Sequence, residues 1–243
     1  MSYLYKLPGP LLVLLGAFSL SFGGLIVKSF DGATLWQILY WRSLFFVLVI
    51  LIFLILTYKA NFLLSFRKSG LPGVIGGLIL STGFCGYVFA MYNTTVANTN
   101  FIIQTQTIFL AIFGYFFLNE KISLRGFFSI ILAFIGMIVL VGDSINSGSL
   151  FGNIVAFAIP INFTILVMII RKFPSLDMVP AIFYSGIFSG VYGLVMSENL
   201  IFSSNDLLMG FLLGVPQLAF GFICVTIGSK STPAVTVGLL MLL

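Results

Sequence analysis

The chain has 243 residues, of which 60% are hydrophobic and only 7% are charged, and its mean hydropathy is +1.21. Soluble domains carry about 25% charged residues, so this composition excludes an ordinary soluble protein and indicates a membrane protein. The formal net charge is +5, but the eleven Lys and Arg residues stand singly or in pairs between apolar runs. That distribution argues against a nucleic-acid partner. The sequence has no histidine, and its two cysteines, Cys85 and Cys224, lie in apolar runs, so we expect no metal, cofactor or disulfide.

Nine apolar segments follow one another along the chain. They cover residues 9–27, 35–57, 71–92, 98–118, 125–142, 150–170, 178–197, 207–228 and 232–243. We predict a helix in each, because helices satisfy their own backbone hydrogen bonds in hydrocarbon and no strand-like alternation is visible. The first segment lacks a signal-peptide cleavage site and is predicted to be retained. The last would be ~18 Å long, short of a ~30 Å hydrocarbon core, so we expect the second half to be truncated.

The basic residues are unevenly divided between alternate loops. With a cytoplasmic amino terminus, nine of the eleven lie in cytoplasmic connections: Lys6, Lys59, Arg67, Lys68, Lys121, Arg125, Arg171, Lys172 and Lys230. The opposite loops contain Lys28 together with Asp31, Asp143, Glu198 and Asp206. The positive-inside rule therefore predicts a multi-pass protein of the plasma or inner membrane with a cytoplasmic amino terminus.

The third and fourth segments resemble the eighth and ninth. A shift of 138 residues aligns five pairs of identical residues: Gly76 with Gly214, Leu80 with Leu218, Gly83 with Gly221, Phe84 with Phe222, and Thr94 with Thr232. A shift from helix three to helix eight implies a repeat of five helices, and an odd number inverts the second copy. We therefore predict an all-α membrane protein with two inverted five-helix repeats, residues 1–145 and an incomplete 146–243. Ten helices would complete the fold, and about nine are present.

Several short motifs follow one another along the chain: residues Gln37 to Arg42, the glycine-rich third helix, Thr94 to Ser123 with its Leu-Asn-Glu-Lys-Ile-Ser end, and Ser231 to Ala234. Their order and spacing resemble the EamA-like branch of the drug/metabolite transporter superfamily. One departure is Gln106-Thr107, where the family often has a Glu-Pro pair. The resemblance implies a ten-helix carrier of amino acids, related metabolites or drugs, often acting outward.

An arginine lies inside the second predicted helix. Arg42 is placed about 10 Å from the start of that helix, where a charge is costly unless it finds a partner or water. Its planar guanidinium suits a bidentate contact with a carboxylate or phosphate, which makes it the first candidate for substrate binding. Snorkelling toward the headgroups or an intramolecular tether is the alternative explanation.

Further polar candidates lie in the fourth, sixth and eighth segments. Asn100, Gln104 and Thr107 follow an i, i+4, i+7 spacing, so we expect them to share a face that looks into the bundle. Asn162 follows Pro160 and Gln217 follows Pro216, where a proline frees backbone carbonyls. Hydrogen bonds between helices, or simple kinks, would explain these residues without a substrate. Lys28 and Glu120, at helix ends, are interpreted as topological.

The combined reading is a secondary transporter, a permease or exporter of small metabolites such as amino acids, that works by alternating access. Its expected partners are a small-molecule substrate and membrane lipid, with a homodimer as one option and no nucleic acid. Two alternatives stay open: a membrane-embedded enzyme and a non-transporting scaffold subunit. The missing histidine and the position of all six carboxylates in loops or at helix ends disfavour the enzyme.

Overall fold

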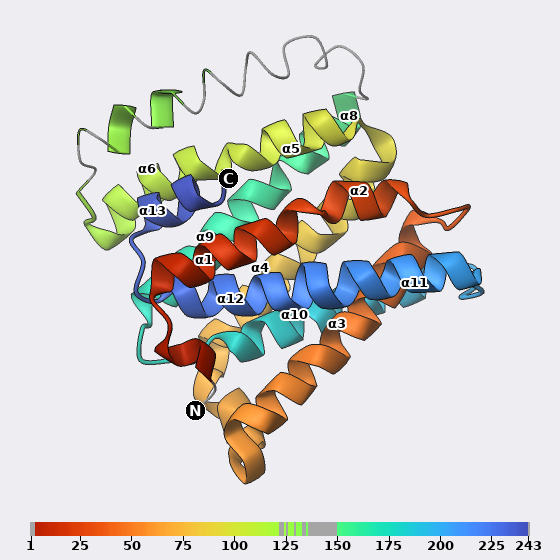
Figure 1. Cartoon of the computed structure of the whole chain (residues 1–243), viewed down its shortest axis with the longest axis horizontal. Coiled ribbons are helices and arrows are strands. Elements are labelled where there is room, and N and C mark those ends of the chain that lie inside the picture. The colour runs from red at the N-terminus through yellow and green to blue at the C-terminus, as the bar shows by residue number, and fades with distance from the viewer. Residues whose placement is uncertain are drawn as a thin grey trace.

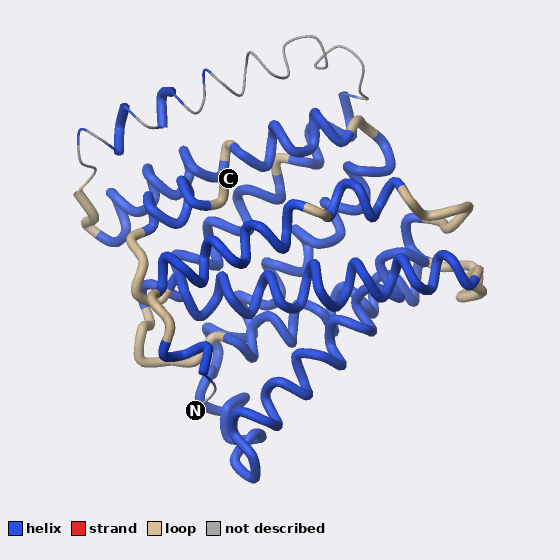
Figure 2. Tube along the Cα trace, viewed as in Figure 1, coloured by secondary structure: helices blue, strands red, loops and turns tan. Residues whose placement is uncertain are grey.

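A computed structural model of the chain describes residues 3–121, 124, 126–128, 130–132, 135 and 150–242. Within these residues the fold is helical throughout, without strands (Figure 1, Figure 2). The elements in chain order are η1 (Tyr3–Lys6), α1 (Gly9–Ser21), α2 (Gly23–Lys28), α3 (Leu35–Tyr58), η2 (Lys59–Asn61), α4 (Phe62–Asn93), α5 (Val96–Gln104), α6 (Gln106–Leu118), α8 (Leu150–Ala156), α9 (Ala158–Lys172), α10 (Val179–Met196), α11 (Ser204–Leu212), the π-helix η4 (Leu213–Ala219), α12 (Phe220–Ser229) and α13 (Ala234–Leu240).

Six helical stretches in the described part of the chain are long and apolar enough to cross a membrane. They are Gly9–Lys28, Leu35–Asn93, Val96–Leu118, Leu150–Lys172, Val179–Met196 and Ser204–Ser229. These stretches coincide with the predicted apolar segments except 125–142, most of which lies outside the described residues, and 232–243, where α13 is short. The multi-pass helical architecture predicted from the sequence is confirmed.

The stretch Leu35–Asn93 contains two crossings rather than one. At 1.5 Å per residue a straight helix of 59 residues would be about 90 Å long, three times a hydrocarbon core. The backbone reverses where Lys59 has a φ of 51° and Gly70 a φ of 54°, both in the left-handed region. The remainder of α4 after Gly70 corresponds to the predicted segment 71–92.

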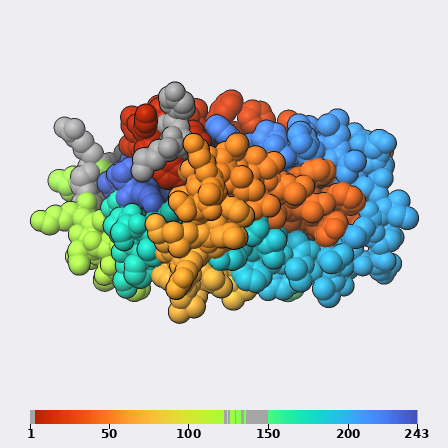
Figure 3. All heavy atoms as spheres, turned by 90° about the horizontal axis from the view of Figure 1, so that it is seen from below, coloured from red at the N-terminus to blue at the C-terminus, as the bar shows by residue number. Residues whose placement is uncertain are grey.

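Helices from the two ends of the chain pack against each other. The most extensive contacts join α10 to α3 and α4, α1 to α12, α9 to α4 and α6, η4 to α3, and α13 to α6. Figure 3 views the face where α3 and α10 lie side by side at the surface. Large apolar side chains such as Ile52 and Leu56 of α3 and Val191 and Val195 of α10 are exposed, as expected of surfaces that face lipid.

Basic residues gather at one end of the bundle. The start of α1 and the ends of α6, α9 and α12 lie together at the left of Figure 1, and the turn after α3 lies below them. The segments at these helix ends contain Lys6, Lys59, Arg67, Lys68, Lys121, Arg171, Lys172 and Lys230. We call this the basic end. The opposite end, with α2 and α11, is called the acidic end because Asp31 and Glu198 lie in its loops and Asp206 in the first turn of α11.

Candidate functional site

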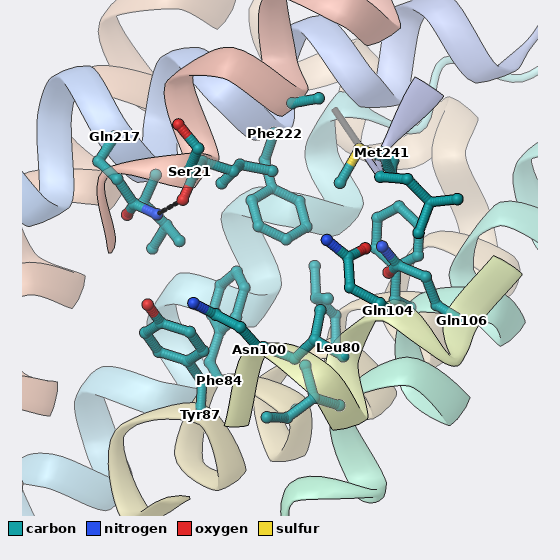
Figure 4. A pocket seen from close by; sticks show the side chains of 18 of the residues that line it. Ser21, Leu80, Phe84, Tyr87, Asn100, Gln104, Gln106, Gln217, Phe222 and Met241 are labelled. Atoms are coloured by element: carbon teal, nitrogen blue, oxygen red, sulfur yellow. Dashed lines mark hydrogen bonds between the residues drawn. The ribbon is translucent and has the colours of Figure 1, made fainter. Parts of the chain in front are cut away.

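A cavity of about 240 Å³ lies among helices from both halves of the chain (Figure 4). Residues from α1, α3, α4, α5, α6, α9, η4 and α12 line it, together with Met241 and Leu242 after α13. The lining combines an apolar wall with a small set of polar side chains, which is the usual composition of a small-molecule site. The polar members are Ser21, Arg42, Tyr87, Asn100, Gln104, Gln106 and Gln217.

Four of the membrane-crossing stretches are interrupted close to this cavity. Regular α-helix stops at Phe22 between α1 and α2, at Thr105 between α5 and α6, and at Phe157 between α8 and α9. In the stretch Ser204–Ser229 the interruption is the π-helix η4. Each interruption lies within two residues of a cavity-lining residue or contains one. Broken helices in membranes are tolerated where they line a cavity, and they are a common feature of transporter sites.

Prolines explain two of these interruptions. Pro160 lacks an amide hydrogen and its ring crowds the carbonyl four residues earlier, at Ala156, which is where α8 ends. Pro216 lies inside η4, and the Ser19 hydroxyl of α1 donates hydrogen bonds to the carbonyls of Pro216 and Gln217. These hydrogen bonds join α1 to η4 beside Pro216.

Arg42 is fully buried at the cavity wall. Its Nη2 atom donates a hydrogen bond of 2.9 Å to the carbonyl oxygen of Phe84. Among the described residues, the Nε and Nη1 atoms have no hydrogen-bond partner, and no carboxylate lies within ion-pair distance of the guanidinium. A buried cation that is only partly satisfied is expensive in a membrane interior. Its two remaining donor positions therefore fit an anionic group.

The amides of the fourth crossing face the cavity only in part. Asn100 and Gln104 of α5 line it, and Figure 4 shows their side chains on the same side as that of Gln106. The turn at Thr105 interrupts the helix, so the residues of α6 are rotated relative to a regular continuation of α5. As a result Gln106 faces the cavity, where a regular helix would have placed Thr107. The Thr107 hydroxyl instead donates to the carbonyl of Gly238, 3.0 Å away, where α6 packs on α13.

Gln217 of η4 lines the cavity from the opposite side. Its Nε2 atom donates to the carbonyl of Leu20 at 3.0 Å, while the buried Oε1 atom has no partner among the described residues. The Oε1 atom of Gln104 is in the same situation. The cavity therefore offers two buried carbonyl acceptors in addition to the donors of Arg42.

Asn162 lies outside the cavity lining. Its Nδ2 atom donates to the hydroxyl of Thr82 at 2.8 Å on an exposed part of the α4–α9 contact. The structure thus brings together Arg42, Asn100, Gln104 and Gln217 and separates them from Asn162 and Thr107.

Three polar lining residues, Ser21, Tyr87 and Gln106, were not named as candidates from the sequence. Gln106 could have been recognised only with the helix break at Thr105 in view. Tyr87 of α4 carries no sequence signal, since tyrosine is common in membrane helices.

The apolar wall is largely aromatic. Phe84 and Phe222, aligned by the 138-residue shift, pack edge to face with ring centroids 5.1 Å apart, and Phe163 lies beyond Phe222 at 6.4 Å. The guanidinium carbon of Arg42 lies 5.2 Å from the centroid of the Phe84 ring. One cavity therefore places a cation beside a surface suited to an apolar or aromatic group.

Three comparisons bear on the chain. The model of the EamA-like transporter family matches residues 7–142, which is more than half of the chain. An uncharacterized transporter of Methanothermobacter thermautotrophicus is 29% identical over 198 residues, covering 75% of this chain and 54% of that protein. The chain thus spans about half the length of this curated relative. A crystal structure with 18% identity superposes with a TM-score of 0.79 and covers 96% of this chain and 83% of that one, a similarity of fold.

Proposed function

This chain belongs to the EamA-like transporter family, and we propose that it is a membrane transporter whose substrates are small carboxylates such as amino acids. We further propose that it works by alternating access in the plasma or inner membrane, with the basic end in the cytoplasm. The single observation that carries the substrate proposal is Arg42, a buried residue of the cavity lining whose Nε and Nη1 atoms have no hydrogen-bond partner among the described residues.

The other polar groups of the cavity favour a substrate with both charges. The carboxylate would accept hydrogen bonds from the free donors of Arg42, since bonds between a guanidinium and a carboxylate are charge-assisted and stronger than neutral ones. An ammonium group would donate to the unpartnered Oε1 atoms of Gln104 and Gln217. The rings of Phe84 and Phe222 would then contact the apolar part of the molecule. A cavity of about 240 Å³ is sufficient for a metabolite of this size.

The pattern of helix contacts supports two inverted repeats, residues 1–145 and 146 onward. A repeat of five crossings makes α1 correspond to α9, α3 to α10, α4 to η4 and α12, and α6 to α13. The contact of α1 with α12 then corresponds to the contact of α9 with α4, and both contacts are extensive. By the same rule α4 on α10 corresponds to η4 on α3, and α6 on α9 to α13 on α1; all of these pairs are in contact.

The repeat-related glycines Gly83 and Gly221 fit the same scheme. Each lies where the third crossing of one repeat meets the first crossing of the other. A Cβ atom on Gly83 would meet Asn162 of α9, and one on Gly221 would meet Leu20 of α1. Such a twofold arrangement about a central site is the architecture that supports alternating access, because one half can rock against the other.

The test is transport by the complete protein in liposomes. Labelled amino acids and other small carboxylates are offered one at a time, and we expect saturable flux for at least one of them. Product formation in detergent without any flux would instead indicate a membrane-embedded enzyme, and the absence of both flux and ligand binding would indicate a scaffold subunit. Either result would contradict the proposal.

A further inference from the structure

A network of charged groups joins three helices at the basic end. Glu120, which follows α6, accepts hydrogen bonds at Oε1 from Nε of Arg171 at 3.0 Å and from Nη2 of the same residue. Its Oε2 atom accepts from the backbone amide of Ala234, the first residue of α13, at 2.7 Å. Arg171 in the last turn of α9 also donates through Nη1 to the carbonyl of Lys230 at 3.2 Å. One carboxylate thus holds together the ends of α6, α9 and α13.

The three helices joined by Glu120 are also helices that line the cavity. Gln106 of α6 and Phe163 of α9 belong to the lining, as does Met241 directly after α13. With a rise of 1.5 Å per residue, Glu120 lies about 21 Å along the crossing from Gln106, and Arg171 about 12 Å from Phe163. The network therefore lies between the cavity and the basic end.

Close packing accompanies the network. A Cβ atom on Gly114 would lie 3.2 Å from the Cβ atom of Ala234, and one on Gly238 would lie 2.9 Å from the backbone of Thr107. These small residues bring α6 and α13 into direct contact beside Glu120. The two helices therefore pack closely between the cavity and the basic end.

A second contact fastens the same end. The hydroxyl of Tyr5 donates to Asp177 Oδ2 at 2.6 Å and so joins the segment before α1 to the loop after α9. Burial and the neighbouring Asp177 charge raise the pKa of Tyr5, so the phenol stays protonated and can donate.

The cavity is more open in the other direction. Among its lining residues Ser21 and Asn100 are exposed, and both belong to the halves of their crossings that lead away from the basic end. Gln106, nearer to Glu120 along the crossing, is 2% exposed. The exposed polar residues of the lining therefore lie on the side away from the Glu120 network.

We infer that Glu120 and Arg171 form the latch of a gate at the basic end, which must open in each transport cycle. This inference rests on the proposed alternating access. For the cavity to open toward the basic end, α6 must separate from α9 and α13, and the hydrogen bonds of Glu120 must break. The side chains of Arg171 and Glu120 are 21% and 13% exposed, so water can replace these bonds, whereas a fully buried pair would resist separation. The interpretation of Glu120 as merely topological is thereby replaced by a positioning role.

The first experiment measures access to the cavity from the basic end. A single cysteine is introduced as Gln106→Cys in a Cys85→Ala/Cys224→Ala background, and its labelling by a membrane-impermeant thiol reagent is followed from each side of oriented vesicles. Glu120→Gln and Arg171→Gln should each increase the labelling rate from the basic end about tenfold, because a charge-assisted hydrogen bond is lost. The double variant should label no faster than either single variant, since both remove the same contact.

The matched control is Glu198→Gln, the same chemical change at an exposed carboxylate near the acidic end. It should leave the labelling rate unchanged. Folded Glu120→Gln protein whose cysteine labels at the parent rate would overturn the latch. Equal acceleration by Glu198→Gln would do the same, because it would show an unspecific effect of charge.

A disulfide tests the same gate without removing a charge. In the background without Cys85 and Cys224, Gly114→Cys/Ala234→Cys brings two Cβ atoms close to disulfide distance. Oxidation should stop flux in liposomes and reduction should restore it. Undiminished flux through the cross-linked protein would contradict the gate. If the parent protein shows no flux at all, the proposed function fails, and the labelling experiment still decides whether Glu120 closes this end.

Discussion

Arg42 and Phe84 are joined twice: the guanidinium donates a 2.9 Å hydrogen bond to the Phe84 carbonyl and lies 5.2 Å from the centroid of its ring. These contacts attach α3 to α4 and fix the direction of the guanidinium. Two nitrogen atoms are left without a partner among the described residues. This arrangement is the basis of the proposal that Arg42 binds the anionic group of a substrate.

Replacing Arg42 should therefore separate stability from binding. We expect Arg42→Met to abolish the thermal stabilisation that a bound carboxylate gives the wild-type protein. The melting temperature without ligand should be unchanged or higher, because a buried charge without a counterion is removed. Arg67→Met, at an exposed position of the basic end, is the control and should keep the ligand shift. A ligand shift that survives Arg42→Met would remove Arg42 from the site.

The amides divide into those inside the cavity and those outside it. Gln104→Leu and Gln217→Leu should each weaken ligand binding by roughly tenfold, the value of about one hydrogen bond. Asn162→Leu and Thr107→Val should leave the dissociation constant unchanged, although Thr107→Val loses the bond to the Gly238 carbonyl and about 1 kcal/mol of stability. Titration calorimetry on the four variants distinguishes the two groups. Equal losses in both groups would contradict the assignment of the cavity as the site.

Substitution by alanine should affect stability differently at two glycines that the repeat aligns, Gly76 and Gly214. A Cβ atom on Gly214 would lie 2.5 Å from the carbonyl oxygen of Arg42, whereas one on Gly76 would have its nearest neighbour at 3.4 Å. Gly214→Ala should therefore lower the free energy of unfolding by about 1–3 kcal/mol and displace α3. Gly76→Ala should be nearly neutral. Thermal unfolding in detergent gives the comparison, and a neutral Gly214→Ala would mean that η4 and α3 are less closely packed than described.

The crossings could be predicted from the sequence because hydrophobic length is a property of each segment alone. The predicted segment 35–57 matches α3 (Leu35–Tyr58) almost to the residue, and 178–197 matches α10 (Val179–Met196). The candidate site was harder, since it depends on where helices are interrupted. A regular helix through Thr105 predicts Thr107 on the cavity face, but the break there turns Gln106 inward instead. No proline marks that break in the sequence.

Side-chain contacts between helices that are distant in the sequence could not be predicted either. Asn162 follows a proline, as Gln217 does, yet its side chain turns to Thr82 while that of Gln217 faces the cavity. Glu120 and Arg171 are 51 residues apart, and nothing in the spacing pairs them. Such contacts depend on how helices rotate and cross, which is decided by packing of the whole bundle.

The predicted orientation has a direct consequence for the loops. Single cysteines introduced as Lys68→Cys and Lys172→Cys, in the background without Cys85 and Cys224, should both react with an impermeant reagent from the cytoplasmic side only. The four segments predicted between these loops, 71–92, 98–118, 125–142 and 150–170, make an even number of crossings, and the positive-inside rule predicts that both loops are cytoplasmic. Labelling of the two positions from different sides would contradict the proposed arrangement of the first five crossings.

Alternating access to one cavity is the central claim, and a single cysteine at Ser21 tests it most directly. Ser21 lines the cavity on its exposed side. In intact proteoliposomes of the complete protein, Ser21→Cys should react with an impermeant thiol reagent added on either side, and a transported carboxylate should slow both reactions. Labelling from one side alone, whatever the substrate concentration, would contradict a cavity that opens to each side in turn.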